Sequence, residues 1–186
     1  DSLRLRGGKR NFELSARHIG DSFRRYEAVE TRNGGVVRML AATATRQEPE
    51  QSGFADVEGG RIWWRMAGAR HLKSDRWPII AVHGGPGGAH DYLEPLMALA
   101  DERAVILYDQ LDCGNSDRPG RAGNWTIERF ASEIDALRTT LGIGRFILLG
   151  HSWGAVIALD YAAHAGEELA GLILASPLIS TPRWVA

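Results

Sequence analysis

The 186-residue chain has only one cysteine, Cys113, and no long hydrophobic run. A single cysteine excludes an internal disulfide framework. No apolar stretch approaches the ~18 to 20 residues that cross a bilayer, and no hydrophobic segment of a secretory signal follows the arginine-rich start. Internal repeats and low-complexity segments are absent as well. We therefore expect a globular protein of the cytoplasm, without a membrane partner, that forms one domain or slightly more.

The chain also lacks a strong excess of either charge, but its charges are unevenly distributed. Residues 1–46 carry ten Arg or Lys against five Asp or Glu, whereas the remainder carries twelve against eighteen. A basic arm can bind nucleic acid, but here acids are interspersed and aromatic residues are not interleaved, so no nucleic-acid partner is expected. We expect residues 1–50 to be a disordered or non-native extension, with residues 1–38 upstream of a functional start at Met39. Residues 51–186 are expected to form the folded part.

From about residue 53 the chain alternates strand and helix patterns. A hairpin is expected around Gly59-Gly60, because both glycines tolerate the positive φ of a tight turn. Short unbroken apolar runs are typical of strands buried on both faces, and they occur at 78–82, 104–110, 146–150 and 169–176. Helices are expected at 91–99 after a cap at Asp91, at 127–141 between Thr126 and Gly142, and at 153–165. This order predicts an α/β protein with a mostly parallel sheet covered by helices.

The hexapeptide GHSWGA, residues 150–155, lies between an expected strand and an expected helix. A Gly-x-Ser-x-Gly sequence in that context is typical of a nucleophile elbow, which would present Ser152 as the nucleophile. Gly150 and Gly154 are expected where a side chain would collide with the neighbouring strand or helix. The helix N-terminus adds unpaired N–H groups and the positive end of its dipole. The alternative is a plain strand-to-helix turn without chemistry.

A glycine-rich turn, HGGPGG at residues 83–88, follows the expected strand at 78–82. It lacks the Gly-Lys-Ser/Thr of a phosphate-binding loop and the third glycine of a dinucleotide fingerprint. We interpret it as an oxyanion turn, in which Gly85, with Gly84 beside it, and Trp153 would donate backbone N–H groups to a tetrahedral intermediate. Pro86 is expected to bias Gly85 toward an extended backbone. The residues expected to support this turn are His83, Pro86 and Gly87.

Histidines near this turn have a second use as metal ligands. His83 and His90 with Asp91 lack the His-Glu-x-x-His or His-x-His spacing of a metal site, so neither a metal nor another cofactor is expected. We expect His83 to brace the turn instead. Cys113 lies in a loop with no recognisable histidine partner, and we interpret it as an unreactive thiol.

Three motifs in order, HGGPGG, YDQLDCGNSDRP and GHSWG, resemble those of the proline iminopeptidases of the α/β-hydrolase superfamily, and ASPLISTPRW is also similar. The resemblance covers roughly residues 53–186. It implies an α/β-hydrolase core and a serine aminopeptidase that releases N-terminal proline from peptides, through an acyl-enzyme and without a metal or organic cofactor. It also implies that acidic residues, largely in a helical cap after the sixth strand, bind the amino terminus of the substrate.

Two positions depart from the family pattern. Asp112 and Ala155 stand where the family usually has glycine. The alanine is a mild change one step into a helix. Asp112 places a charged side chain in a loop that the family packs near the site, where it would strain the loop or alter substrate preference, and we expect it to be tolerated.

The histidine and the acid that follow the serine in this family have no counterpart in this chain. After Ser152 the single histidine is His164, twelve residues on, which is roughly 18 Å along a helix. We therefore expect the sheet to stop after about the sixth strand, with the last strands, the cap and the catalytic Asp and His beyond Ala186. The chain alone is then expected to be inactive or nearly so, and to self-associate through the exposed edge of the strand at 169–176.

Two other functions stay open beside the aminopeptidase. An amidase or esterase on the same scaffold would use the same acylation machinery on a small amide or ester. A catalytically inactive fragment or binding module would explain the absent base, but it would not need an intact oxyanion turn.

Overall fold

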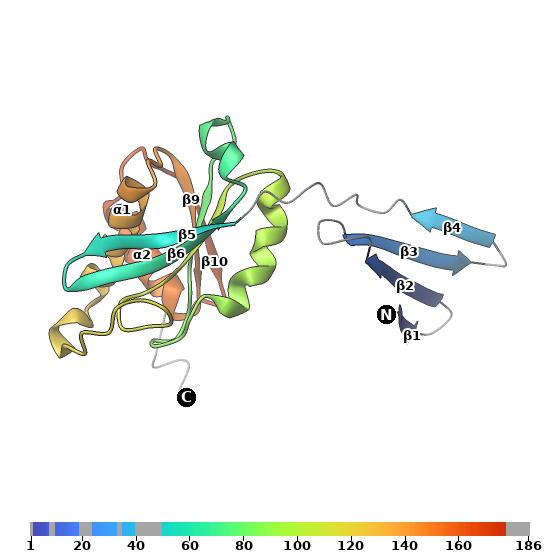
Figure 1. Ribbon diagram of the computed structural model, residues 1–186, viewed down its shortest axis with the longest axis horizontal. Coiled ribbons are helices and arrows are strands. Elements are labelled where there is room, and N and C mark those ends of the chain that lie inside the picture. Colours follow the sequence, from blue (N-terminus) through green and yellow to red (C-terminus); the bar gives the residue numbers. More distant parts are fainter. Residues whose placement is uncertain (1, 8–9, 19–23, 33–34, 40–49, 178–186) are drawn as a thin grey trace. The chain divides into compact units, whose positions relative to one another are not determined.

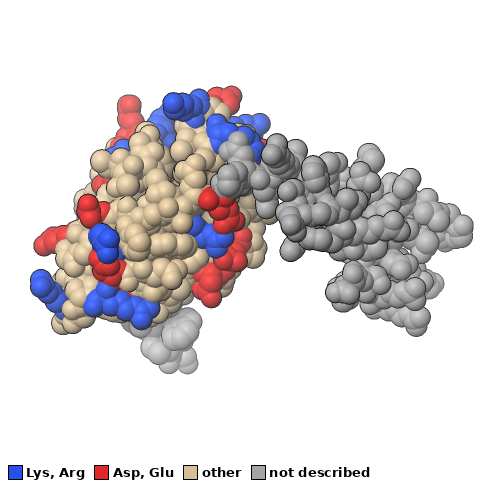
Figure 2. Space-filling model, viewed as in Figure 1, with Lys and Arg blue, Asp and Glu red and all other residues tan. Residues whose placement is uncertain are grey.

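The computed structural model describes residues 2–7, 10–18, 24–32, 35–39 and 50–177. The chain divides into two compact units, Asp1–Gln47 and Glu48–Ala186 (Figure 1). On the face of the second unit that Figure 2 presents, Lys and Arg side chains are mixed with Asp and Glu. Within the described ranges, no helix is long and apolar enough to cross a membrane.

The first unit contains a four-stranded antiparallel sheet in the order β1 (Ser2–Gly7), β2 (Arg10–His18), β3 (Arg24–Arg32) and β4 (Gly35–Met39). Its register places Leu3, Leu14, Ala28 and Met39 in one row. Apolar and polar residues alternate along β1 and β2, and this period of two favours strands. The strands differ from the irregular backbone expected here. The expectation that this segment is a non-native extension stays a prediction.

The second unit is built on a six-stranded sheet in the order β10-β9-β7-β8-β6-β5. Strands β7 to β10 pair in parallel, whereas β5 and β6 form an antiparallel hairpin at one edge. The strands are β5 (Gln51–Val57), β6 (Gly60–Ala67), β7 (Ile79–Val82), β8 (Val105–Asp109), β9 (Phe146–His151) and β10 (Leu169–Ala175). The predicted mostly parallel sheet with an N-terminal hairpin is confirmed.

The hairpin turn lies one residue earlier than expected. Val57 pairs with Gly60, so the two turn residues are Glu58 and Gly59, and of the two glycines only Gly59 has a positive φ, 93°. Gly60 is the first residue of β6, and a Cβ atom there would lie 2.9 Å from Leu111 Cδ1. Its lack of a side chain therefore serves packing rather than the turn.

Two α-helices cover one face of this sheet, α1 (Ile127–Thr140) and α2 (Trp153–His164). The predicted start and end of α1 are confirmed, since Thr126 Oγ1 accepts a 3.2 Å hydrogen bond from the Arg129 N–H and Gly142 takes a φ of 64°. The shorter 3₁₀ segments are η1 (Ala69–Lys73), η2 (Asp91–Asp101) and η3 (Ala122–Asn124).

The helix expected at 91–99 is the 3₁₀ helix η2, and Asp91 does not cap it. His90 precedes the helix, no side chain caps it, and Pro95 lies inside it. Proline has no N–H to donate to the preceding turn, so a regular α-helix is disfavoured at that point.

The core has two layers, one on each face of the sheet. Along β7, Ile80 and Val82 join the cluster beneath α1 and α2, whereas Ile79 and Ala81 join the cluster beneath η2. Figure 1 shows α1 and α2 on one side of the sheet and η2, drawn in yellow-green, on the other. The central strands are therefore buried on both faces. Because β7, β8 and β9 are parallel, their carboxyl ends lie at the same end of the sheet, where binding sites of open α/β sheets form.

Candidate active site

Ser152 lies in a sharp turn between β9 and α2. Its backbone has φ 53° and ψ −115°, although it is not glycine, and such strained residues concentrate at functional sites. Its N–H donates to the Ala175 carbonyl at 2.9 Å. Its side chain makes no capping hydrogen bond even though it stands at the cap position of α2. The hydroxyl is therefore available for chemistry.

The two glycines that flank this serine are required by space. A Cβ atom at Gly150 would lie 2.4 Å from the Gly154 carbonyl oxygen, and one at Gly154 would lie 2.2 Å from the Val82 carbonyl oxygen. Real Cβ atoms do not approach backbone oxygens so closely. The steric reason expected for both glycines is thus present. The close approach at Gly154 also shows that the elbow packs directly against the end of β7.

The glycine-rich turn after β7 lies directly against the serine. A Cβ atom at Gly84 would lie 3.0 Å from Ser152 Cβ. Gly85 has a φ of 145°, which L-residues rarely adopt, instead of the extended backbone expected before Pro86. A Cβ atom at Gly85 would also lie 2.6 Å from the Gly87 nitrogen, because the turn folds back on itself. This position is therefore restricted to glycine.

One of the three expected oxyanion donors is already used. The Gly84 N–H donates to the Tyr92 hydroxyl at 2.5 Å, and this hydroxyl lies 2.9 Å from His151 Nδ1. The Tyr92 and His151 rings also contact each other, with centroids 5.2 Å apart. Partial burial raises the pKa of Tyr92, so the hydroxyl stays protonated at neutral pH. Gly84 is therefore corrected from a donor to an anchor of the turn.

Two backbone donors of the expected oxyanion site are left, Gly85 and Trp153. Trp153 is the first residue of α2, and the first N–H groups of a helix have no acceptor within it. The positive end of the α2 dipole lies at the same place. Sequence reasoning had no means to find Tyr92, because no motif marks its hydroxyl. The one feature of the sequence that could have drawn attention to Tyr92 is its place at the start of η2, soon after the glycine-rich turn.

His83 braces the turn as a neutral side chain. Its ring is fully buried, and its Nε2 accepts a 3.0 Å hydrogen bond from the Gln110 N–H. Nδ1 must then carry the proton, which it donates to the Gly84 carbonyl at 2.8 Å. The Gln110 side chain returns a 2.8 Å bond to the His83 carbonyl. Burial lowers the pKa of His83, so the ring carries no charge at neutral pH. Its two hydrogen bonds connect the turn to the loop after β8.

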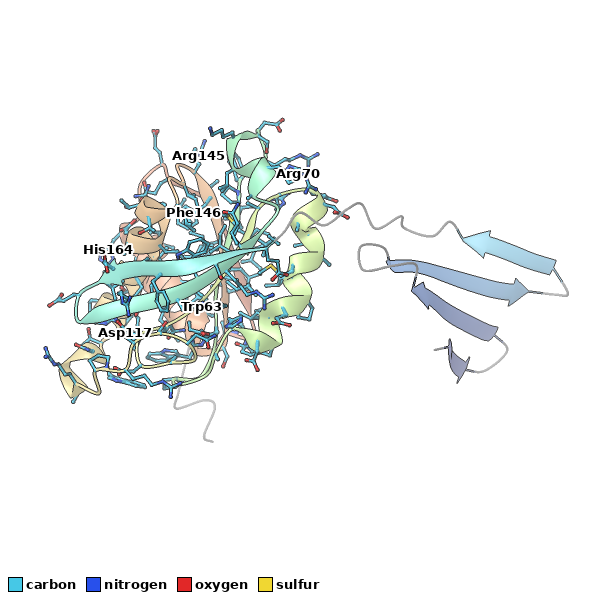
Figure 3. The ribbon with its side chains drawn as sticks, viewed as in Figure 1. Trp63, Arg70, Asp117, Arg145, Phe146 and His164 are labelled. Carbon is cyan, nitrogen blue, oxygen red and sulfur yellow. The ribbon has the colours of Figure 1, made fainter. Side chains whose placement is uncertain are left out.

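Asp109, at the end of β8, is paired with a histidine that sequence reasoning considered only as a metal ligand. His90 donates both its backbone N–H and its Nδ1–H to Asp109 Oδ1, each at 2.8 Å. Asn115 donates its backbone and side-chain N–H groups to Oδ2, at 2.8 and 3.2 Å. Trp63, labelled in Figure 3, packs on the His90 ring with centroids 4.7 Å apart. Both carboxylate oxygens are therefore engaged in holding loops.

The histidines near the turn do not converge on a shared site. His83 bonds Gln110, whereas His90 bonds Asp109. Across the described ranges, no group of three or more His, Cys, Asp or Glu side chains could hold a metal ion.

Asp112 occupies a backbone position that favours glycine. Its φ is 66°, and Asp is among the few non-glycine residues that adopt this region at modest cost. Its Oδ1 accepts from the Gly120 N–H at 2.8 Å and its Oδ2 from the Trp125 indole N–H at 3.2 Å. The two hydrogen bonds of the carboxylate thus stabilise the loop and offset the cost of a positive φ at a residue other than glycine.

The same loop contains Cys113. Glu133 of α1 binds the backbone of this loop at Leu111. Burial raises the pKa of the Cys113 thiol to about 11, so the thiol is protonated and unreactive at neutral pH. Glu133 Oε1 accepts a 2.9 Å hydrogen bond from the Leu111 N–H and also pairs with Arg129. Complete burial raises the pKa of Glu133 to about 8, although Arg129 and the Leu111 N–H oppose the shift.

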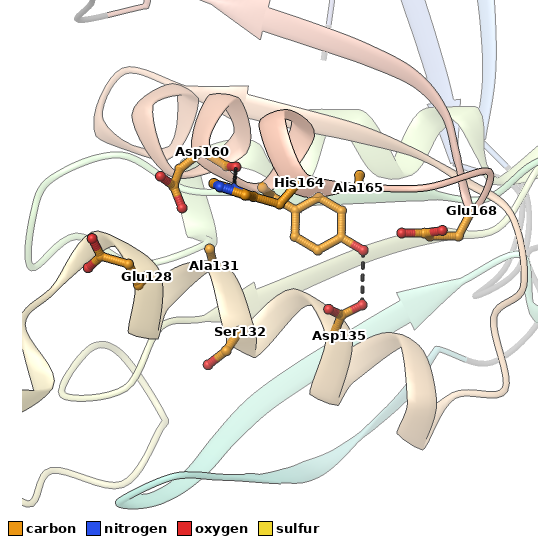
Figure 4. Close-up of a pocket in the computed structure, with 9 residues that line it drawn as sticks. Glu128, Ala131, Ser132, Asp135, Asp160, His164, Ala165 and Glu168 are labelled. Carbon is orange, nitrogen blue, oxygen red and sulfur yellow. Dashed lines mark hydrogen bonds between the residues drawn. The ribbon is translucent and has the colours of Figure 1, made fainter.

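A general base for Ser152 is not found among residues 50–177. No described histidine forms a hydrogen bond with the Ser152 hydroxyl. His164, at the far end of α2, bonds the Asp160 carbonyl at 3.0 Å. It lines a separate hollow of about 280 Å³ between α1 and α2 (Figure 4). The placement of the base and acid beyond Ala186 stays a prediction.

The second unit resembles known proteins in sequence. The α/β-hydrolase fold family matches residues 78–185. The proline iminopeptidase of Heyndrickxia coagulans is 40% identical over 132 residues, which are 71% of this chain and 45% of that protein. The proline iminopeptidase of Saccharolobus solfataricus is 37% identical over 134 residues, 71% of this chain and 42% of that protein. The chain thus spans less than half the length of these two curated relatives.

Solved structures show the same similarity in three dimensions. The crystal structure of a proline iminopeptidase from Mycobacterium smegmatis has a TM-score of 0.67 and 36% identity, covering 72% of this chain and 46% of that one. The crystal structure of VinJ has a TM-score of 0.63 and 36% identity, covering 68% of this chain and 44% of that one. The resemblance read from the three motifs is confirmed.

Proposed function

Because the chain belongs to the α/β-hydrolase fold family, we propose that it supplies the nucleophile and the oxyanion donors of a serine hydrolase that releases N-terminal proline from peptides. The observation that carries this proposal is the contact between the two turns, since a Cβ atom at Gly84 would lie only 3.0 Å from Ser152 Cβ. Similarity to proline iminopeptidases at 37% and 40% identity supports the substrate class.

The proposed reaction begins with attack of Ser152 Oγ on the carbonyl carbon of the N-terminal proline residue. A base takes the serine proton, and the negative oxygen of the tetrahedral intermediate accepts hydrogen bonds from the Gly85 and Trp153 N–H groups. The intermediate collapses, and the remaining peptide leaves as an amine that takes up the proton. Water then hydrolyses the prolyl ester and regenerates the Ser152 hydroxyl. Loss of one oxyanion donor from such a site slows the reaction about 100 to 1000-fold.

We further propose that the base is a histidine oriented by an aspartate, as in other serine hydrolases, and that neither belongs to residues 50–177. Within those residues, Tyr92 and His83 act as positioning residues. Tyr92 bonds both Gly84 and His151, and therefore holds the oxyanion turn to the elbow. His83 bonds Gln110, and therefore holds the same turn to the loop after β8. The cytoplasmic location expected from the sequence stays a prediction.

Two further candidates follow from specific observations. All the groups assembled at Ser152 act on a carbonyl and its developing charge, and none of the described contacts distinguishes proline, so an amidase or esterase would use the same arrangement. The absence of a hydrogen-bonded base within residues 50–177 favours a non-catalytic role for the chain itself.

The test is a substrate profile of the natively expressed protein. We expect proline p-nitroanilide to be cleaved with a higher kcat/KM than alanine p-nitroanilide or p-nitrophenyl acetate, and Ser152→Ala to abolish turnover. Ser132→Ala is the matched control, because its hydroxyl is on α1 and bonds only the Arg129 carbonyl. Preference for the ester or for the alanine substrate would favour the second candidate, and equal activity of the Ser152→Ala variant would refute the role of Ser152.

A further inference from the structure

A second hollow lies at the edge of the sheet opposite the elbow. Its volume is about 190 Å³, and its walls are formed by Leu72, Ser74, Arg76, Trp77, Pro78, Ile143, Gly144 and Arg145. Pro78 immediately precedes β7 and Arg145 immediately precedes β9. Because these strands are parallel neighbours, their starts meet at one edge and their carboxyl ends at the other. The hollow is therefore separate from the candidate active site.

Arg76 and Arg145 contribute two positive charges to this hollow. Both side chains are exposed, and among residues 50–177 neither forms an ion pair with a carboxylate. Asp75, the acid next to Arg76 in sequence, is not part of the walls. Figure 3 labels Arg145 and Arg70 at this end of the unit. The arginines that do pair with carboxylates in the described part are Arg61, Arg65, Arg70, Arg129 and Arg138.

Contacts within the hollow hold the Arg145 side chain and the backbone of Arg76. Arg145 stacks on the Trp77 ring, with its Cζ 5.0 Å from the ring centroid, and such cation–π contacts hold a guanidinium in place. Ser74 Oγ donates to the His71 carbonyl at 2.8 Å and accepts from the Arg76 N–H at 3.1 Å. The backbone that carries Arg76 is therefore an ordered turn, so a ligand would meet a largely preformed site.

The two segments are also joined to each other. The Ile147 N–H, at the start of β9, donates to the Pro78 carbonyl at 2.8 Å. This bond sets the spacing between the segment before β7 and the segment before β9. Arg76 and Arg145 thus line one hollow from the two segments that lead into neighbouring strands, and this backbone bond holds those segments together.

We propose that this hollow binds the phosphate group of a small molecule. A guanidinium donates through a flat fork that suits oxyanions. A planar carboxylate is matched by one such fork, whereas a phosphate group offers three strong acceptor oxygens and so accommodates two arginines from different segments. Free phosphate and a phosphate monoester share this chemistry. The proposal does not depend on the hydrolase function, because no residue of the hollow contributes to the elbow or the oxyanion turn.

The test is a titration of the ¹⁵N-labelled protein in its natively expressed form, followed through the Trp77 indole N–H and the arginine Nε–H resonances. Sodium phosphate and glycerol 3-phosphate are added in separate arms at constant ionic strength, with sodium chloride and sodium acetate as further arms. Arg76→Gln and Arg145→Gln are each expected to weaken phosphate binding about tenfold. Arg121→Gln is the matched control, because Arg121 is exposed and lies in the loop after β8.

Saturable shifts of Trp77 with either phosphate compound, weakened by both substitutions and unchanged in Arg121→Gln, would support the proposal. The arm with the tighter binding identifies free phosphate or the monoester as the source. Shifts that do not saturate, shifts of equal size with chloride, or acetate binding as tight as phosphate would overturn it. The wild-type titration alone is decisive if a variant fails to fold, which its melting temperature reveals.

Discussion

At the scale of single residues, the sequence locates the reacting groups but not the side chains that hold them. Ser152, Gly150 and Gly154 are predictable because a five-residue motif encodes one backbone turn. The bond from Tyr92 to His151 joins residues 59 positions apart, and the bond from His90 to Asp109 joins residues 19 apart. Only the folded sheet brings such partners together. The bond from the Gly84 N–H to Tyr92, eight residues on, was not expected for a different reason, since no motif marks that hydroxyl.

Asp112 provides a test at this scale. We expect Asp112→Ala to lower the free energy of unfolding by ~1 to 3 kcal/mol, because the positive φ is kept while both hydrogen bonds of the carboxylate are lost. Asp112→Gly should lose less, because glycine adopts this φ without strain. Urea denaturation followed by tryptophan fluorescence measures both values. An Asp112→Ala variant as stable as wild type would show that the carboxylate does not fasten the loop.

At the scale of elements, strands and helices are predictable where local signals agree. The cap at Thr126, the apolar spacing of α1 and the glycine after it all indicate one helix, and the observed limits follow them. At η2, Pro95 conflicts with the expected helix, and the element is 3₁₀ instead. In β1 and β2, apolar and polar residues alternate as in strands, whereas the charge distribution indicates an extension. Local signals therefore fail where two of them disagree.

The link between α1 and the loop after β8 predicts a dependence of stability on pH. Burial raises the pKa of Glu133 from an ordinary 4.5 to about 8 in the folded chain. The stabilisation from the protonated form is then complete below pH 4.5 and is lost as the pH rises through 8. We expect the free energy of unfolding to fall across this window by up to ~1.4 kcal/mol per pH unit from this group.

Glu133→Gln isolates this contribution, because glutamine does not titrate. Urea denaturation at pH 5, 6.5 and 8 should show a flatter pH dependence for Glu133→Gln than for wild type. Glu128→Gln is the matched control, since Glu128 is an exposed acid on the same helix. Parallel pH profiles for wild type and Glu133→Gln would mean that Glu133 is already ionised in the folded protein, paired with Arg129.

At the scale of the whole second unit, the class of sheet is predictable and the strand order is not. Unbroken apolar runs predict strands buried on both faces, which β7 and β8 confirm. The order β10-β9-β7-β8-β6-β5 depends on which strands pair across helical crossovers, and no local pattern encodes that choice. One consequence concerns β10, which in the described part pairs only with β9 and has no buried residue.

The β10 edge therefore predicts self-association. Within residues 50–177, its outer N–H and C=O groups face no other strand, an arrangement that another chain can extend, and Ile173 is 43% exposed. We expect sedimentation velocity to show a weight-average mass that rises with concentration, and Ile173→Lys to shift the protein toward monomer. Leu99→Lys is the matched control, because Leu99 is 39% exposed on η2. A monodisperse wild-type monomer at every concentration would contradict this expectation.

The most direct test of the account is detection of the acyl-enzyme. The natively expressed protein is mixed with proline p-nitroanilide, quenched in acid at early times and examined by peptide mass spectrometry. We predict a prolyl ester on the peptide that contains Ser152, formed with the first release of p-nitroaniline and absent from Ser152→Ala. Turnover with the prolyl group on another residue, or undiminished turnover by Ser152→Ala, would contradict the assignment of Ser152 as the nucleophile.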